Sequence, residues 1–161
     1  MIRNIESKDV EQICEIYNHY VENAVCTFEV EPVTVDEMTK RIENVTGVYP
    51  WIVAEEEGLI IGYAYAGRWK EREAYRFTVE TSVYIRFGYV GRRIGSTIYT
   101  SLIRRLRSQG IHAVIGGVVL PNEKSERLHE RLGFEKIGHF AEVGFKFDSW
   151  RDVGYFELIL K

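Results

Sequence analysis

Apolar residues in the first third of the chain fall at helical spacing after a short strand-like run. Residues 2–5 predict a strand, and a helix is expected to follow Ser7 or Asp9, either of which could cap it. The apolar positions of that helix recur every three or four residues, at Val10, Ile13, Ile16, Tyr17 and Tyr20. A second helix is predicted over 35–45.

The middle of the chain changes to strand-like patterning. Strands are predicted at 51–54, 59–66 and 79–85, with a charged turn at 55–58 that joins the first two as a hairpin. The segment after them predicts a helix that Gly110 would end, because an apolar residue recurs at every fourth position. The residues of this stripe are Ile94, Ile98, Leu102 and Leu106.

The last third predicts a strand at 113–119, a helix from 121 to Gly133, and closing strands at 134–140 and 155–160. The order is therefore β, α, α, β, β, β, α, β, α, β, β, with no internal repeat or linker. This order predicts one mixed α/β domain over 1–161. Because it is not a regular βαβ alternation, a doubly wound sheet is disfavoured.

Composition narrows the possible functions. The chain has 161 residues, 45% of them hydrophobic, so it can bury a core without staples. Its net charge of −3 argues against nucleic acid as a partner, which would need a basic stripe. No apolar run is long enough to span a membrane. No set of histidine, cysteine or aspartate residues has metal-ligand spacing, so we expect no metal. The two cysteines form no such cluster, so we expect reduced thiols, which fit a cytoplasmic protein.

A glutamate, Glu80, lies within the strand 79–85, although this residue type is depleted in strands. Alternation places it on the face opposite Val79 and Thr81. The strand alone supports two interpretations equally. Glu80 either lies on a solvated sheet face or acts as a general base beside a bound amine in a cleft.

The loop 88–96, between this strand and the next helix, is rich in glycine and holds Arg92 and Arg93. Glycines let backbone approach a ligand, and the free N–H groups of a helix start attract anions. The loop therefore predicts a site for a phosphate-bearing cofactor, although Gly91 and Gly95 also fit an ordinary turn. It is neither a P-loop nor a dinucleotide fingerprint, because the residues and spacing of those motifs are missing.

Three polar residues, Asn122, Ser125 and His129, share one face of the helix that follows Pro121. A lone histidine on a helix is more often a surface residue than a catalyst. The alignment with two further polar groups favours a chemical role, since histidine titrates near neutrality.

The charged segment 69–75, just before the Glu80 strand, is the last candidate. Its Lys70 and Arg72 could hold an anionic group of a substrate, because arginine suits a carboxylate bidentately. An ordinary solvated loop explains the same residues.

Taken in order, these segments resemble the GNAT superfamily of acyl-CoA-dependent N-acetyltransferases, and within it the phosphinothricin acetyltransferase family. The resemblance covers nearly the whole chain. The late segments are the most specific to that family. Segments that carry it include Tyr17-Asn18, Tyr49-Pro50-Trp51, Leu120-Pro121-Asn122, His129-Glu130, Gly144-Phe145-Lys146 and Trp150-Arg151-Asp152-Val153-Gly154.

The resemblance implies a GNAT fold, which is a mixed β-sheet splayed open at the Glu80 strand, flanked by helices, with acetyl-CoA in the split. It implies that Glu80 is the general base and His129 the catalytic histidine, and that the protein forms a homodimer. The implied cofactor-binding residues are Val83, Tyr84 and Ile85 for the pantetheine arm, Gly91, Arg92, Arg93, Ile94, Gly95 and Ser96 for the pyrophosphate, and Asn122 with Ser125 on its helix face. The implied acceptor-binding residues are Phe28, Lys70, Arg72 and Tyr75.

One part of the loop departs from the superfamily pattern Gln/Arg-x-x-Gly-x-Gly/Ala. The aligned residues read Val90-Gly91-Arg92-Arg93-Ile94-Gly95. Arg93 stands in place of a glycine, so its side chain must stay out of the path of the pyrophosphate or pair with a phosphate.

The hypothesis that follows is direct transfer of acetyl from acetyl-CoA to the α-amine of a small amino-acid-like acceptor, of the phosphinothricin, methionine sulfone or methionine sulfoximine type. Glu80 would deprotonate the ammonium, directly or through water, and backbone N–H groups near Val83 would polarise the thioester carbonyl. Lys70 and Arg72 would hold the carboxylate or phosphinate. His129 would either assist deprotonation or protonate the leaving thiolate.

Two alternatives stay open. One is a GNAT acetyltransferase for another amine, such as a polyamine, an aminoglycoside or a peptide N-terminus, and Lys70 with Arg72 argues against a cationic acceptor. The other is a CoA-binding module without turnover, which only the imperfect loop supports.

Overall fold

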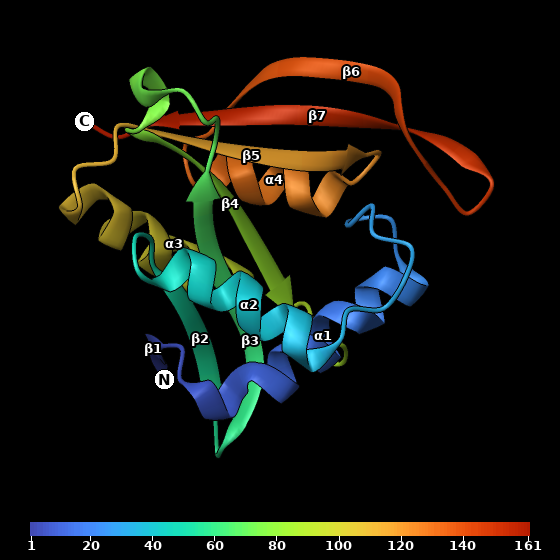
Figure 1. The fold of residues 1–161 in the computed structure, drawn as a ribbon. Coiled ribbons are helices and arrows are strands. Elements are labelled where there is room, and N and C mark those ends of the chain that lie inside the picture. The colour runs from blue at the N-terminus through green and yellow to red at the C-terminus, as the bar shows by residue number, and fades with distance from the viewer.

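The computed structural model describes residues 1–161 and contains one mixed sheet with helices on both faces (Figure 1). Its strands are β1 (Ile2–Asn4), β2 (Trp51–Glu56), β3 (Leu59–Arg68), β4 (Thr78–Ile85), β5 (Ala113–Leu120), β6 (Glu135–Lys146) and β7 (Ser149–Ile159). Its α-helices are α1 (Val10–Asn23), α2 (Val35–Thr46), α3 (Ile94–Ser108) and α4 (Glu123–Arg131), and two short 3₁₀ helices cover Ser7–Asp9 and Glu73–Tyr75. The predicted order of strands and α-helices is confirmed.

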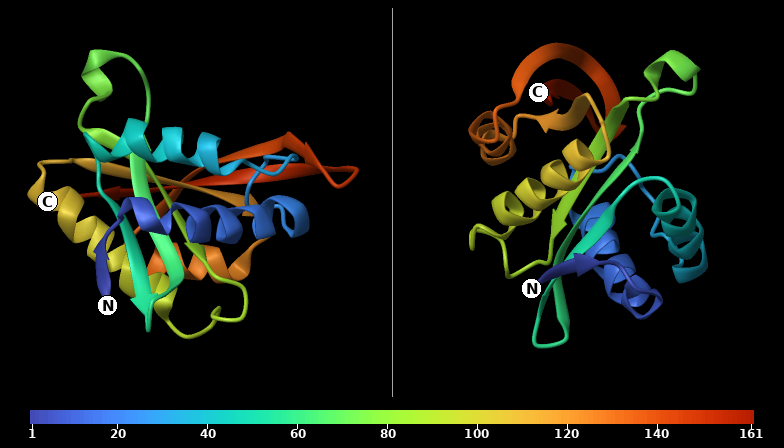
Figure 2. Two further views of the ribbon diagram at one scale, coloured as in Figure 1. Left: turned by 60° about the horizontal axis from the view of Figure 1, so that its bottom comes forward. Right: turned by 90° about the vertical axis from the view of Figure 1, so that its left-hand side faces the viewer.

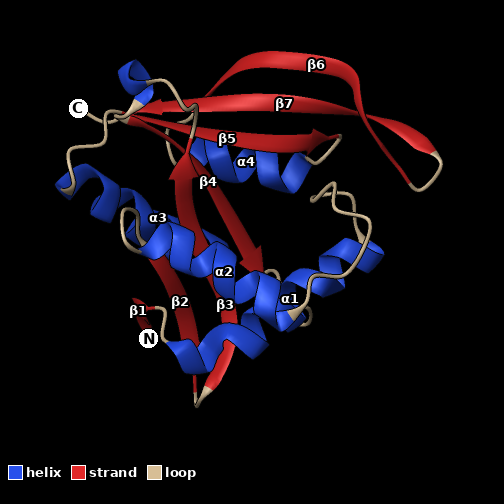
Figure 3. Cartoon of the chain, in the orientation of Figure 1, coloured by secondary structure: helices blue, strands red, loops and turns tan.

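The strands lie in the order β1-β2-β3-β4-β5-β7-β6, and every neighbouring pair except β4 and β5 is antiparallel. The parallel pair is short. Only Thr78–Glu80 of β4 pairs with Ala113–Ile115 of β5. Beyond these residues the two strands diverge, as Figure 3 shows. The sheet is therefore split from Glu80 onward, as predicted.

Each face of the sheet carries its own apolar core. Helices α1 and α2 lie on one face and α3 and α4 on the other, which the right-hand view of Figure 2 separates clearly. The predicted stripe of α3 is confirmed, because Ile98, Leu102 and Leu106 are fully buried against Val79 and Val114. On the other face, α1 buries its own stripe against β2 and β3.

Three details of the predicted elements are wrong. Strand β2 runs on to Glu56, so the turn is shorter than predicted and consists of Glu57 and Gly58, with φ of 50° and 83°. The Asp9 side chain does not cap α1. It accepts a hydrogen bond from the Glu6 N–H at 2.7 Å and pairs with Arg3 instead.

The two closing strands are also far longer than the predicted 134–140 and 155–160, since β6 and β7 continue as a hairpin to a turn at 147–148. Val143, Phe145 and Trp150 of this extension are exposed, and a register shift interrupts the pairing between Phe140 and Gly144. From 143 to 146 exposure does alternate, but the exposed side chains are apolar and the buried positions are Gly144 and Lys146. This inverts the pattern of apolar-in and polar-out that sequence reading detects.

Candidate active site

The loop from β4 to α3 wraps around the first turn of the helix. Gly88 and Gly91 adopt φ of 89° and 90°, and Arg93 precedes α3 in the left-handed region with φ of 62°. The backbone N–H groups from 91 to 96 donate to no other group of the chain. A cluster of free amides at a helix N-terminus suits a doubly charged diphosphate, so the residues present fit the cofactor that the sequence predicts.

The two arginines of this loop differ in their surroundings. The guanidinium group of Arg92 pairs with the Glu56 carboxylate at 3.2 Å and lies over the Tyr89 ring. The Arg93 side chain is exposed and makes no ion pair. Arg93 is therefore the free positive charge beside the amide cluster.

Glu80 lies on β4 at the last residue that pairs with β5, so its side chain stands where the sheet begins to split. It is half-buried, and burial raises the pKa of its carboxyl group above the usual value, while the positive charge of Lys70 acts in the opposite direction. No hydrogen bond contributes to this pKa. A raised pKa and a carboxylate free of partners are the properties of a general base.

The residues that the resemblance implies for the acceptor come from two separate loops. Lys70 lies over the ring of Trp69 at 5.0 Å, and Trp69 packs edge-on against Tyr155 of β7. Arg72 and Tyr75 are exposed on the same connection between β3 and β4. Phe28 comes from the α1–α2 connection and is 38% exposed. Within this set, Lys70 is the residue whose positive charge lowers the pKa of Glu80.

His129 is buried rather than on the surface, and it ends a chain of hydrogen bonds along α4. Asn122 caps the helix, because its Oδ1 accepts from the Ser125 N–H at 3.1 Å. The Ser125 carbonyl in turn lies 2.7 Å from His129 Nδ1. The structure thus brings together the three polar residues predicted to share a helix face.

The carbonyl of Ser125 also fixes the tautomer of His129. Since a carbonyl only accepts, Nδ1 carries the ring hydrogen and Nε2 keeps its lone pair in the neutral ring. Burial lowers the pKa of His129 and so favours this neutral form.

Sequence reasoning missed the groups that surround Nε2. The Tyr99 hydroxyl lies 3.4 Å from this nitrogen and 2.5 Å from Thr81 Oγ1, so it bridges His129 to β4. Gly116 of β5 leaves the space for the ring, because an added Cβ would lie 2.6 Å from Nε2. Two adjacent glycines inside a predicted strand, Gly116 and Gly117, were the available signal for such a close approach.

Glu80 and His129 lie on opposite faces of the sheet. Consecutive side chains of a strand point to opposite faces, and Thr81, which follows Glu80, points to Tyr99 and His129. Both residues nevertheless lie at the same level along the strands, because Glu80 pairs with Ile115 and His129 contacts the next residue, Gly116. They flank the start of the split from its two sides.

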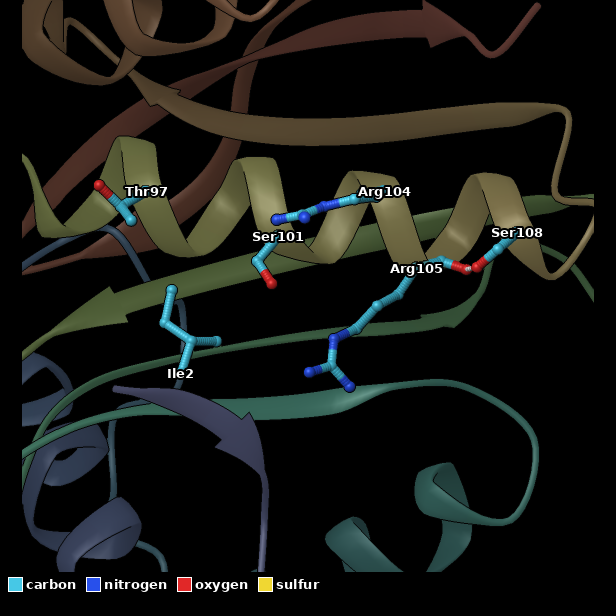
Figure 4. A pocket seen from close by; sticks show the side chains of 6 residues that line it. All are labelled: Ile2, Thr97, Ser101, Arg104, Arg105 and Ser108. Carbon is cyan, nitrogen blue, oxygen red and sulfur yellow. Dashed lines mark hydrogen bonds between the residues drawn. The ribbon is translucent and has the colours of Figure 1, made fainter.

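A cavity of about 480 Å³ lies elsewhere, between α3 and β1 (Figure 4). Its two arginines point in different directions, with Arg104 lying along the helix and Arg105 reaching to Asn4 of β1. It contains none of the candidate residues and no convergent set of charges, so we assign it no ligand. No cluster of three or more histidine, cysteine or acidic side chains has metal-binding geometry, and no helix is both long and apolar enough to cross a membrane.

The comparison with protein families decides what this arrangement is. Residues 2–154 match the family described as an acetyltransferase (GNAT) domain. The chain belongs to the GNAT acetyltransferase family. It is 41% identical to a phosphinothricin N-acetyltransferase of Streptomyces viridochromogenes over 97% of this chain and 85% of that protein. It is 35% identical to an L-methionine sulfoximine/L-methionine sulfone acetyltransferase of Salmonella typhimurium over 99% of this chain and 94% of that protein.

Solved structures of GNAT proteins match the whole fold. A phosphinothricin acetyltransferase from Sinorhizobium meliloti in complex with acetyl-CoA superposes with a TM-score of 0.97 at 36% identity, and the match covers 99% of this chain and 88% of that one. The predicted family, the GNAT fold and the enzyme class of acyl-CoA-dependent N-acetyltransferase are thereby confirmed.

Proposed function

We propose that the protein transfers an acetyl group from acetyl-CoA to the α-amine of a small amino-acid-like acceptor of the phosphinothricin, methionine sulfone or methionine sulfoximine type. The observation that carries the proposal is the half-buried, unpartnered carboxylate of Glu80 at the start of the split, with Lys70 acting on it. The relatives named above, which act on acceptors of this kind, support the same substrate class.

Acetyl-CoA, when bound, supplies the acetyl group as an activated thioester. The backbone of Val83, Tyr84 and Ile85, which no residue of β5 pairs with, would hold the pantetheine arm. The free amides from Gly91 to Ser96 would hold the pyrophosphate. Asn122 uses its oxygen as a helix cap, so its amide N–H₂ and the Ser125 hydroxyl remain available for the same ligand.

On the acceptor side, Glu80 would take a proton from the ammonium group and so produce the nucleophilic amine. Lys70 and Arg72 would hold the carboxylate or phosphinate, and Phe28 and Tyr75 would form walls of the site. Holding the amine beside the base supplies much of the rate, because the reaction then proceeds as if within one molecule.

His129 would act as a base or hydrogen-bond acceptor rather than as an acid. The supporting observations are its Nδ1–H tautomer and its lowered pKa, which leave Nε2 unprotonated at neutral pH. Of the two roles that the sequence allowed, these observations favour assistance with deprotonation.

An acceptor screen with acetyl-CoA and detection of the released thiol tests the proposal. We expect turnover with phosphinothricin, methionine sulfone and methionine sulfoximine. Turnover only with spermidine, an aminoglycoside or a peptide would show that the acceptor is another kind of amine and would refute the proposed substrate class. Tight acetyl-CoA binding without release in the presence of any acceptor would establish a binding module instead.

We also propose that residues 1–161 form one catalytic domain that acts in the cytoplasm without a metal. The free thiols of Cys14 and Cys26 support a reducing compartment. Because no metal takes part in the proposed reaction, acetyl transfer should be unchanged by EDTA. The same thiol-release assay measures this.

We propose further that the protein is a homodimer joined through the β6–β7 hairpin. Strand β6 is an edge of the sheet, and six large apolar side chains of the hairpin are more than half exposed. They are Ile137, Phe140, Val143, Phe145, Phe147 and Trp150. An exposed apolar cluster of this kind is typical of an interface. Light scattering should give twice the chain mass, and Trp150→Asp should give the monomer mass.

A further inference from the structure

The connection between α1 and α2, residues 24–34, reaches across to strand β6 and is fixed there by two contacts. We call this connection the acceptor loop because it carries Phe28, which the proposed function places in a wall of the acceptor site. The partners on β6 are Gly144 and Lys146, more than a hundred residues away in the sequence.

The first contact joins the Phe28 ring to the backbone of Gly144. A Cβ built at position 144 would lie 2.3 Å from Phe28 Cζ and 2.4 Å from Cε2, which no real contact allows. The φ of Gly144 lies outside the left-handed region, so the backbone itself would accept another residue. The glycine is required by the ring that rests on it.

The second contact is a buried lysine. Lys146 is only 3% exposed, and its Nζ donates a hydrogen bond to the Thr27 carbonyl at 2.9 Å. No carboxylate lies within ion-pair distance of this ammonium group, and burial lowers its pKa. Burying an ammonium group without a counterion is costly, so the bond to the acceptor loop is a substantial part of what compensates it.

The loop is anchored on its other side as well. The Tyr17 hydroxyl of α1 lies 2.8 Å from Thr27 Oγ1 and donates to Glu29 Oε1, and Arg41 of α2 pairs with Glu29. The residues on both sides of Phe28 are therefore held to the helices, while β6 fixes the ring itself. A small movement of β6 would move the ring relative to Glu80.

We propose that Gly144 and Lys146 are positioning residues that set the affinity for the acceptor by fixing Phe28 in the wall of the acceptor site. The inference rests on the proposed function through the role of Phe28. It assigns to the hairpin a part in substrate selection, although neither β6 residue reaches Glu80.

The contact with Gly144 is tested by a double-mutant cycle. Gly144→Ala should raise KM for the acceptor by about tenfold or more, because overpacking must displace the ring, with kcat and KM for acetyl-CoA changing much less. In a Phe28→Ala background the same substitution should have no further effect. Gly138→Ala on the same strand is the control, since an added Cβ there meets nothing within 4 Å.

The contact with Lys146 is tested by hydrogen exchange, which needs no turnover. Lys146→Met should speed exchange of the amides from 25 to 31 and raise KM for the acceptor, and Lys146→Arg should restore both in part. Lys136→Met, an exposed lysine of the same strand, is the control.

Additive effects of Gly144→Ala and Phe28→Ala, or unchanged exchange in Lys146→Met, would overturn the inference. Failure of the proposed function looks different. The wild-type protein would then acetylate none of the amino-acid analogues, while exchange in the acceptor loop would still respond to Lys146→Met.

Discussion

The two faces of the sheet differ sharply at the point where β4 and β5 separate. On one face Glu80 has no hydrogen-bonded partner, and the exposed Lys70 of a loop is the positive charge that acts on it. On the other face His129 is enclosed by aromatic rings, with a carbonyl and a hydroxyl at its two nitrogens. The open face leaves a charged group free to react, while the closed face fixes a neutral ring in one orientation. The faces should therefore respond differently to substitution.

The largest difference is expected from Glu80→Gln. Loss of the base should lower kcat by about 10²–10⁴-fold, with the fold and acetyl-CoA binding retained. The wild-type kcat/KM should also fall as the pH drops through the raised pKa of Glu80, because the protonated carboxyl cannot accept a proton. Steady-state kinetics over a pH series measures both effects, and near-normal turnover in a folded variant would refute the base assignment.

The same substitution should not destabilise the protein. The folded pKa of Glu80 is raised from 4.5, so the carboxyl group contributes most stability below that pH, and this contribution is lost as the pH rises through the folded value. At pH 7 the glutamine variant should therefore be at least as stable as the wild type in urea unfolding.

The second largest effect is expected on the closed face, from the adjacent glycines of β5. Gly116→Ala places a methyl group 2.6 Å from His129 Nε2, so it should cost about 1–3 kcal/mol in stability and lower kcat to the level of a His129 variant. Gly117→Ala points to the open face, where its methyl group would lie 3.4 Å from the Tyr155 ring. It is the matched control and should be milder in both respects. Equal effects would show that the closed face is not the more tightly packed of the two.

The contrast between the faces also explains what could be predicted from the sequence. The α3 stripe and the face of α4 that carries Asn122, Ser125 and His129 depend on local spacing, and both predictions were correct. Glu80 stood out because its residue type is unusual in a strand. The positions of these elements in the fold followed from the family resemblance rather than from periodicity.

The surroundings of His129 could not be predicted in the same way. Nothing in the sequence indicates that Tyr99 contacts His129. Its bridge from Thr81 to His129 joins β4, α3 and α4, which are separate segments of the chain. Burial of His129 depends on the missing side chain of Gly116, which carries no periodic signal of its own. The full length of the β6–β7 hairpin was not predicted for a related reason, since its extension exposes Phe145 and Trp150 and buries Lys146.

A smaller effect is expected from the pH dependence of stability on the closed face. The folded pKa of His129 is lowered from 6.5, so its contribution to stability is complete above that pH and falls as the pH drops towards the folded value. His129→Gln should remove this part of the acid sensitivity. Urea unfolding of both proteins at pH 7.5 and 5.5 gives the stability that each loses on acidification. The difference between the two losses reports on His129, because the contributions of the other three histidines cancel. An equal loss of stability in both proteins would mean that His129 is accessible to protons in the folded state.

The smallest effect is expected in the loop before α3, whose free amides belong to neither of the two faces compared above. Arg93→Ala should raise KM for acetyl-CoA by about two- to fivefold at low salt, because an exposed ion pair with a phosphate contributes little and is screened. Alanine at the same left-handed φ of 62° leaves the backbone as strained as before, so the change isolates the charge. Arg92→Ala is the matched control, since Glu56 already neutralises that arginine, and it should have less effect.

If Arg92→Ala had the larger effect, the ion pair with Glu56 would have to open when acetyl-CoA binds. If neither variant changed KM, the backbone amides alone would hold the pyrophosphate, and the replacement of a glycine by Arg93 would be neutral for the cofactor.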